Sequence, residues 1–245
     1  MAERTNCEMW KMEAKNEDTI NLMIYDRVEG DSYDWWSGEK IKSETSARHF
    51  KEELDKYPNA EKINIFINSV GGSVLEGSAI YNLLKRHNAE KTVYIDGFAC
   101  SIASVIAMAG DKIIMPKTAV MMIHNPWTYA VGNAEELRKE ADDLEKIGES
   151  MRQAYLVKAG EKLSEEKLVE MMNAETYLTA EECIKYGLAD AHEEEKPEKP
   201  EEPKEKAEAR AKVEKARAEQ AQAAIEQEMT RRREMAQAVV EKYIK

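Results

Sequence analysis

The chain has 245 residues, enough for one large domain or two modest ones. Hydrophobic residues make up 42% and charged residues 34%, and the formal net charge is −12. This acidic balance argues against nucleic acid as a partner, and no apolar run reaches the ~18 residues that a membrane span requires. The first residues lack the apolar core of a secretory signal, and three widely spaced cysteines indicate no disulfide framework. We therefore expect a soluble, cytoplasmic protein.

The first segments in chain order predict a leader, a strand and a helix. Residues 1–18 are polar and without pattern, which predicts a flexible leader. Clustered apolar residues at 19–26 predict a strand, and a loop rich in Gly, Asp and Ser follows at 29–38. Residues 43–57 have the pattern of an amphipathic helix, ended by Pro58. The folded part of the chain is therefore expected to begin at about residue 19.

The middle of the chain alternates between strand and helix patterns. Residues 63–68 (INIFIN) predict a strand, and a Gly-Gly pair ends it. Ser73 and Glu76 have the spacing of a capping box, which predicts a helix that continues to about residue 87. Another strand is expected at 91–95. Residues 101–109 are apolar on all sides, which predicts a short buried helix.

The same alternation continues to about residue 191. Two short strands are expected at 112–116 and 119–124, and longer helices at 133–160 and 179–187, each opened by a capping-box pair. A strand followed by a helix about every 25 to 30 residues indicates βαβ crossovers. We therefore predict an α/β fold with a parallel sheet and helices packed on it.

The composition changes after the α/β region. Residues 192–206 contain three prolines among glutamates and lysines, which is typical of a stiff, solvated linker. Residues 207–245 have no Pro or Gly and consist mostly of helix-forming residues, which predicts a charged helical tail. The last 55 residues carry 13 basic and 14 acidic side chains, so the net negative charge belongs to the preceding body.

Few residues have the spacing of a known chemical motif. The sequence has no Cys-x-x-Cys, no His-x-x-x-His and no Gly-x-x-x-x-Gly-Lys, so no metal and no cofactor is expected. His49, His87 and His192 are expected to be solvated. His124 differs because it ends a hydrophobic strand, where it is either a hydrogen-bonded structural residue or part of a site built at strand ends.

Ser101 lies at an expected corner between a strand and a buried helix. It is either the cap of that helix, or a nucleophile whose oxyanion would meet the backbone amide of Ile102. The neighbouring thiol of Cys100 is an alternative nucleophile, although a small buried cysteine more commonly packs the core. The glycine pair at 71–72 either makes a tight turn or lets an amide approach a reacting carbonyl.

Four segments taken together resemble a known family. The ordered set is INSVGGSV (67–74), GFACSIAS (97–104), MMIHNPW (121–127) and ETYLTAEECIKYGLAD (175–190). It is similar to ClpP, the proteolytic subunit of the Clp protease, in the clan that also holds the crotonases. The similarity is greatest to ClpP-like proteases of phages and prophages, which are associated with capsid maturation. It covers residues 19–191 and implies a ClpP/crotonase-like superhelix of repeated β-β-α units, with a C-terminal charged helical extension.

The resemblance implies a serine endopeptidase and assigns its residues. Ser101 matches the nucleophile and His124 the base, while the amides of Gly72 and Ile102 match the oxyanion hole. Glu175 occupies the position of the family's aspartate, with one more methylene and therefore a different reach. Such a triad acts on protein or peptide substrates, here unfolded or extended segments.

The resemblance also implies how the protein assembles. The family forms ring-shaped homo-oligomers through the long helix, where Leu144, Ile147 and Met151 form an apolar strip. A Clp ATPase, or a phage capsid or scaffold protein, is the implied partner. Docking to a ring ATPase is less well supported, because Val70 replaces the usual proline and residues 1–18 do not match the family's axial loop.

Two other functions remain open on the sequence. The chain could be a non-catalytic assembly or scaffolding protein that uses a protease-like fold. It could instead be a crotonase-type acyl-CoA enzyme, which is disfavoured because Ser101 and His124 would then have no role.

Overall fold

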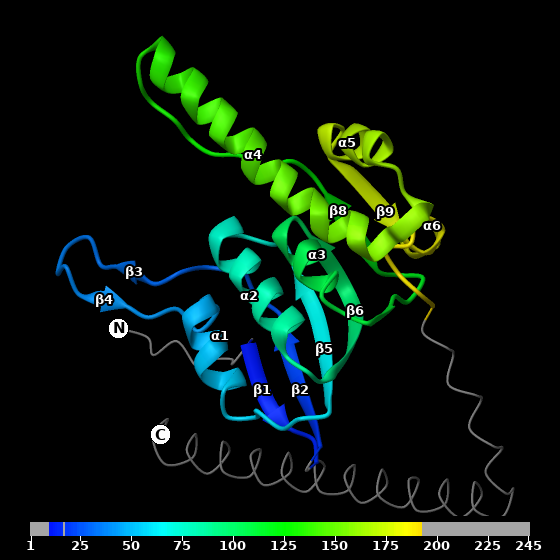
Figure 1. Cartoon of the computed structure of the whole chain (residues 1–245). Helices are drawn as coiled ribbons and strands as arrows, with labels where there is room; N and C mark the ends of the chain where they lie inside the picture. The colour runs from blue at the N-terminus through cyan, green and yellow to red at the C-terminus, as the bar shows by residue number, and fades with distance from the viewer. Residues whose placement is uncertain (1–9, 17, 193–245) are drawn as a thin grey trace, which may run out of the picture. The chain divides into compact units, whose positions relative to one another are not determined.

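The computed structural model describes residues 10–16 and 18–192, and it has the expected α/β architecture (Figure 1). Seven strands form one sheet in the order β1-β2-β5-β6-β8-β9, with β7 also paired to β6. Except for His192, the linker expected at 192–206 lies outside the described residues, and so does the helix expected at 207–245.

The strands of this sheet are β1 (Trp10–Ala14), β2 (Thr19–Ile24), β5 (Lys62–Ser69), β6 (Glu90–Cys100), β7 (Lys112–Ile114), β8 (Val120–Ile123) and β9 (Thr176–Thr179). A separate hairpin consists of β3 (Ser32–Tyr33) and β4 (Lys40–Ile41). The helices are α1 (Ala47–Leu54), α2 (Val74–Arg86), α3 (Ile102–Ala107), α4 (Ala134–Ala159), α5 (Glu165–Asn173) and α6 (Ala180–Lys185).

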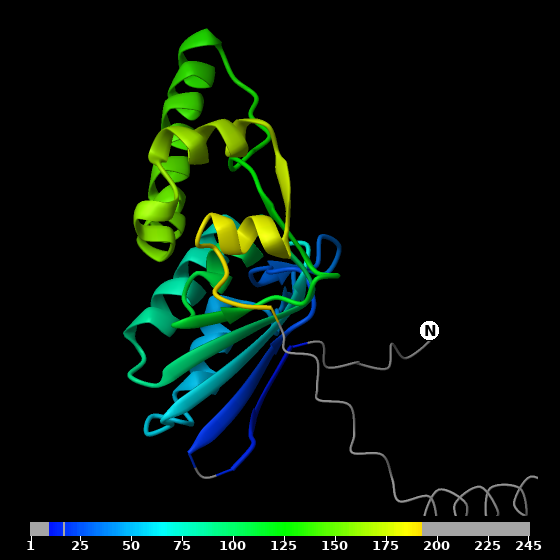
Figure 2. The same ribbon diagram turned by 90° about the vertical axis from the view of Figure 1, so that its right-hand side faces the viewer.

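The centre of the sheet is parallel and its two ends are antiparallel. Strands β2, β5, β6 and β8 run in the same direction, whereas β1 pairs antiparallel with β2 and β9 antiparallel with β8. Along β5, the side chains of Ile63, Ile65 and Ile67 are fully buried and alternate with partly exposed ones. Helices α1 and α2 cover the face to which these isoleucines belong, and Figure 2 shows both helices on one side of the sheet.

Helix α3 lies inside the molecule, as its composition predicts. All six of its residues are buried, because it packs between the sheet, α2 and α4. Helix α4 begins at the expected capping box, in which Asn133 and Glu136 bond to each other's backbone, and it extends beyond the sheet in Figure 1. Helix α6 begins at the second expected box, Thr179 with Glu182.

Two segments expected to lack regular structure contain strands. Residues 10–14, assigned to the flexible leader, form β1, which pairs with β2 from Trp10 opposite Ile24 to Ala14 opposite Ile20. The buried Trp10 ring packs edge-on against Phe50 of α1, so one aromatic contact attaches this polar segment to the core. The loop expected at 29–38 contributes to the β3–β4 hairpin.

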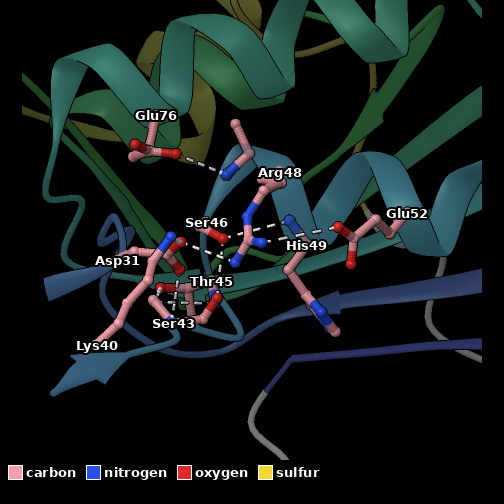
Figure 3. A network of polar contacts seen from close by, with 10 residues as sticks. Asp31, Lys40, Ser43, Thr45, Ser46, Arg48, His49, Glu52 and Glu76 are labelled. Carbon is pink, nitrogen blue, oxygen red and sulfur yellow. Dashed lines mark hydrogen bonds and ion pairs between the residues drawn. The ribbon is translucent and has the colours of Figure 1, made fainter.

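The capping box expected at the start of α2 is only half formed. The Ser73 hydroxyl accepts a hydrogen bond from the Glu76 amide, as expected. The Glu76 carboxylate does not return this bond but accepts from the Ala47 amide at the start of α1, at 2.7 Å. Glu76 therefore joins two helices that are far apart in sequence (Figure 3).

A network of ion pairs anchors the β3–β4 hairpin to α1 (Figure 3). The Asp31 carboxylate lies 2.8 Å from Lys40 Nζ and 2.7 Å from Arg48 Nη2, and it accepts from the Ser43 amide. The Lys40 bond, the Ser43 bond and the Arg48 charge lower the pKa of Asp31 from 3.8 to about 2. The tip of the hairpin carries two outward-facing indoles, Trp35 and Trp36, which are 92% and 89% exposed.

Across residues 10–16 and 18–192, no helix combines the length and the apolar character needed to cross a membrane.

Candidate active site

The register of two neighbouring parallel strands brings Ser101 and His124 together. Strand β6 pairs with β8 so that Cys100 lies opposite Met122, and the Ser101 amide donates to the Met122 carbonyl at 2.8 Å. Because parallel strands end at the same edge of a sheet, the residues that follow each strand become neighbours. His124 Nε2 lies 2.7 Å from Ser101 Oγ, within hydrogen-bond distance.

Ser101 precedes α3 but does not act as its cap. Its side chain makes no capping bond, and its hydroxyl contacts the imidazole of His124 instead. Its backbone has φ 55° and ψ −130°, a combination that a residue with a Cβ rarely adopts. The interpretation of Ser101 as a helix cap is therefore wrong, and its hydroxyl faces a base.

The Gly-Gly turn lies directly against this serine. At Gly71 the φ is 91°, and a Cβ there would be 2.7 Å from the Cys100 carbonyl oxygen and 3.2 Å from the Ile102 nitrogen. Hydrogen bonds from the Val28 amide to the Gly71 carbonyl and from the Ser73 amide to the Val28 carbonyl hold the turn.

Neither of these hydrogen bonds uses the Gly72 amide. The Ile102 amide is the first of α3, and such amides have no partner within their own helix. Both amides expected to bind an oxyanion therefore belong to segments that meet at Ser101.

Glu175, expected to be the third member of a triad, lies in the same groove but apart from His124. It precedes β9, its side chain is exposed, and its φ is 50°. Among the residues that the structure describes, its carboxylate makes no hydrogen bond to the imidazole. The structure thus brings the serine and the histidine together and leaves the acid nearby.

These residues share a groove of about 840 Å³. Most of its walls are apolar, and Arg27 and Glu140 add one charge of each sign. The apolar lining residues are Val70, Val74, Leu75, Met122, Pro126, Trp127, Leu144, Ile147 and Met151. The strip on α4 that the sequence places at a subunit contact therefore lines the groove beside Ser101, and Ile147 is 43% exposed there.

The other candidate residues have structural environments. Cys100 is buried, does not line the groove, and has a pKa raised by burial, so its thiol is protonated and unreactive near neutral pH. His87 is not simply solvated, since Nδ1 accepts from the Ala89 amide and Nε2 contacts the Tyr57 carbonyl. Within the described ranges, no group of three or more His, Cys, Asp or Glu side chains could hold a metal ion.

Two polar residues behind the serine escaped the sequence analysis. The Ser104 hydroxyl lies 2.5 Å from the Ser101 carbonyl oxygen and 2.6 Å from the hydroxyl of Tyr155 in α4. Both side chains are buried. The sequence contains one indication of this pair, because Ser104 is the only polar residue in the IASVIA segment of α3. Its partner in α4 could not be identified from sequence spacing.

This arrangement can support acyl transfer. A serine hydroxyl is a weak nucleophile at neutral pH and needs an adjacent base, which His124 provides at hydrogen-bond distance. A neutral imidazole can accept the proton and return it to a leaving amine. The glycine turn and the start of α3 both lie against Ser101, and backbone amides at such positions are the kind of donor that stabilises an oxyanion in acyl transfer.

Comparisons with known proteins agree with this chemistry. The sequence model of the Clp protease family matches residues 37–195. The chain is 34% identical, over 141 residues, to the ATP-dependent Clp protease proteolytic subunit of Chlorella vulgaris, covering 55% of this chain and 69% of that protein. With the subunit of the same name from Deinococcus radiodurans it shares 32% identity over 140 residues, covering 56% of this chain and 67% of the relative.

Among solved structures, a point mutant of ClpP1 from Listeria monocytogenes has the same fold. The TM-score is 0.59 at 22% sequence identity, and the match covers 74% of this chain and 93% of that chain.

Proposed function

This chain belongs to the Clp protease family, and from that membership we propose that it is a serine endopeptidase that cleaves unfolded or extended protein segments. The observation that carries the proposal is the 2.7 Å contact between Ser101 Oγ and His124 Nε2, both of which line a groove. The strained backbone of Ser101 costs stability and persists only because the surrounding structure enforces it. A non-catalytic scaffold would gain nothing from this cost.

In the proposed mechanism, Ser101 Oγ attacks the carbonyl carbon of the scissile peptide bond. His124 Nε2 accepts the hydroxyl proton, and the carbonyl oxygen becomes an oxyanion beside the amides of Gly72 and Ile102. The tetrahedral intermediate then breaks its C–N bond as His124 returns the proton to the leaving amine. Water hydrolyses the acyl-enzyme by the same steps, and Glu175 stabilises the imidazolium electrostatically.

The form of the groove supports extended segments as substrates. It is an open, mostly apolar trough of about 840 Å³ rather than an enclosed cavity. A folded domain has few free main-chain carbonyls that could reach Ser101 within such a trough. An extended segment can place its carbonyl there and its apolar side chains against α4.

We further propose that the chain works as a ring-shaped homo-oligomer whose protease body includes β1 and so begins at about residue 10, rather than at residue 19, and continues to about residue 191. The matched relatives are named ATP-dependent, which supports a Clp ATPase as the partner. A phage-type enzyme, which the motif set of the sequence suggests, would instead act with capsid or scaffold proteins in capsid maturation. Adding a Clp ATPase and ATP distinguishes the two, because only the first partnership predicts accelerated degradation of a folded substrate.

The catalytic proposal is tested by labelling the purified full chain with a fluorophosphonate. We expect one covalent adduct, which peptide mapping places on Ser101, and its loss in Ser101→Ala. We also expect slower labelling in His124→Ala, because the hydroxyl loses its base. Absence of an adduct in the parent protein, together with no hydrolysis of casein, would overturn the proposal in favour of a non-catalytic assembly protein.

A further inference from the structure

We propose that Ser104 and Tyr155 are positioning residues, which hold the peptide unit between Ser101 and Ile102 in the orientation that oxyanion stabilisation requires. The inference rests on the proposed peptidase function and deepens it, because neither residue faces the groove.

The two side chains form a directed chain of hydrogen bonds that ends on the serine backbone. The Ser104 hydroxyl donates to the Ser101 carbonyl oxygen at 2.5 Å, and its oxygen lies 2.6 Å from the Tyr155 hydroxyl. A hydroxyl has a single proton to donate. Since the Ser104 proton is engaged with the carbonyl, the Tyr155 hydroxyl must donate to Ser104. The order is therefore Tyr155 to Ser104 to the carbonyl of Ser101.

The surroundings keep this chain of bonds in one state. The side chains of Ser104 and Tyr155 are 0% and 1% exposed, so water does not compete for either hydroxyl. Burial also raises the pKa of Tyr155 well above its ordinary value of 10.0. The phenol therefore stays protonated, and remains a donor, throughout the pH range in which a histidine base functions.

The carbonyl that receives these bonds shares one rigid unit with the Ile102 amide. A trans peptide is planar, so its C=O and N–H point in opposite directions. Fixing the Ser101 carbonyl toward Ser104 therefore fixes the Ile102 N–H away from the buried side. This amide lies at the glycine turn, since a Cβ on Gly71 would be 3.2 Å from the Ile102 nitrogen.

The peptide unit needs to be held because Ser101 is strained. Its φ of 55° lies in a region that residues with a Cβ normally avoid. On the N-terminal side, the Ser101 amide is fixed to the Met122 carbonyl at 2.8 Å. On the C-terminal side, the carbonyl accepts from both the amide and the hydroxyl of Ser104. Two donors on one carbonyl also polarise the amide, which makes its N–H a stronger donor to an oxyanion.

A purely structural role makes a different prediction. If Ser104 and Tyr155 only satisfied each other in the core, losing one hydroxyl would lower thermal stability and leave turnover unchanged. If they position the Ile102 amide, turnover falls while substrate affinity is retained, because an oxyanion exists only after attack has begun.

The experiment compares Tyr155→Phe, Ser104→Ala and the double variant of the full-length chain. We expect kcat to fall roughly tenfold in each, less than the loss on removing an oxyanion donor outright, with KM within about twofold of the parent. The affinity for a peptide boronate, which forms a tetrahedral adduct on the serine, should fall by the same factor as kcat. The double variant should resemble Ser104→Ala, because the residues act in series.

Ser46→Ala serves as the matched control. It removes a buried hydroxyl that caps α1 outside the groove, so it should lower the melting temperature without changing kcat. The pH dependence of kcat/KM should keep the parental apparent pKa in every variant, because the hydrogen-bond chain does not include His124.

Several outcomes would overturn the inference. Parental kcat in Tyr155→Phe and Ser104→Ala with a lowered melting temperature would leave both residues with a core role only. A change confined to KM would point to groove shape instead. If the parent chain reacts with a fluorophosphonate but the variants react equally fast, the positioning role alone fails. If the parent does not react, the peptidase function fails and this inference fails with it.

Discussion

At the scale of single residues, backbone strain is concentrated in the groove. In the described part of the chain, the two non-glycine residues with positive φ are Ser101 at 55° and Glu175 at 50°. Both line the same groove, although they are 74 positions apart in sequence. Such conformations cost about 1–3 kcal/mol each and persist where packing and hydrogen bonds enforce them. Their coincidence at one groove supports a shared role.

The serine itself gives the first prediction. Ser101→Ala should lower kcat for a peptide substrate by about 10³-fold or more, because only oxyanion binding and substrate positioning remain. Folding should be retained, since the Ser101 side chain makes no capping bond to α3. Steady-state hydrolysis and the melting temperature measure the two effects. Ser164→Ala, which removes the cap of α5, is the control that should lose stability but not activity.

Glu175 gives the second prediction. Glu175→Gln should lower kcat by about 10- to 100-fold, less than a buried triad acid, because the exposed carboxylate acts on the imidazolium through solvent. Glu175→Asp should retain most activity, since aspartate keeps the charge and tolerates the left-handed backbone. Glu181→Gln, at an exposed position in α6, is the control. A parental rate for Glu175→Gln would leave a serine–histidine dyad.

The glycine turn gives the third prediction, for which the chain contains its own control. Gly38 has φ 70° and no atom within 4 Å of an added methyl group, whereas at Gly71 a methyl would lie 2.7 Å from the Cys100 carbonyl oxygen. Gly38→Ala should therefore cost about 1 kcal/mol for backbone conformation alone. Gly71→Ala should cost about 1–3 kcal/mol more and abolish activity. Urea unfolding measures the stability of the two variants, and fluorophosphonate labelling measures their activity. Equal stability would contradict the close approach of Gly71 to the Cys100 carbonyl.

At the scale of elements, the β3–β4 hairpin is held by charge rather than by a core. Its anchor is Asp31, whose ion pairs with Lys40 and Arg48 are partly exposed. Pairs of this kind contribute little to global stability one by one. We therefore expect these ion pairs to determine how well the hairpin is ordered, and not how stable the whole domain is. The fluorescence of Trp35 and Trp36 at its tip can report this local ordering.

The fourth prediction is that the conformational order of the β3–β4 hairpin depends on pH. The pKa of Asp31 is lowered in the folded protein, from 3.8 to about 2. A group with a depressed folded pKa stabilises the folded state fully above its unfolded pKa, and this stabilisation is lost as the pH falls through the folded pKa. Tryptophan fluorescence should therefore change between pH 3.8 and about 2. Asp31→Asn should lack this transition and show weaker amide protection in the hairpin at neutral pH.

Elements whose signals are local were predictable from the sequence. The capping boxes at Asn133 and Thr179 open α4 and α6 as expected, and the all-apolar segment of α3 is buried. Strand β1 was missed because its pairing with β2 and the contact of Trp10 with Phe50 stabilise it, not its own polar sequence. The second half of the expected box at Ser73 failed for the same reason, since the competing partner of Glu76 lies in another helix.

In the candidate site, too, residues that belong to local motifs were predictable, whereas contacts between distant elements were not. Ser101, His124, Gly72 and Ile102 could be nominated from motifs, and strand register then explains how the first two meet. The contact of Ser104 with Tyr155 could not be nominated, because it joins two helices and leaves no spacing pattern. The sequence also could not predict that the apolar strip of α4 (Leu144, Ile147 and Met151) lines the groove, because an apolar stripe does not identify the surface that it contacts.

At the scale of the whole molecule, the described body stays paired up to its last residues. Ala191 pairs with Ile114, and its carbonyl accepts from the Met115 amide at 3.0 Å, so the chain stays attached to β7 up to this point. The fifth prediction is that a chain ending after His192 keeps its fold, its oligomeric state and its reaction with a fluorophosphonate. Native mass measurement and labelling test this. A monomeric or insoluble product would show that residues 193–245 belong to the assembly.

The order of strands in the sheet also has a consequence for biosynthesis. Strands β1, β2, β5, β6, β8 and β9 lie side by side in the order in which the ribosome makes them. Each strand can therefore add to an edge that already exists, because domains fold from the N-terminus during synthesis. The serine arrives with the end of β6, but its base arrives only with the end of β8, 23 residues later. The contact between Ser101 and His124 therefore cannot form in a nascent chain until the strands up to β8 have been made.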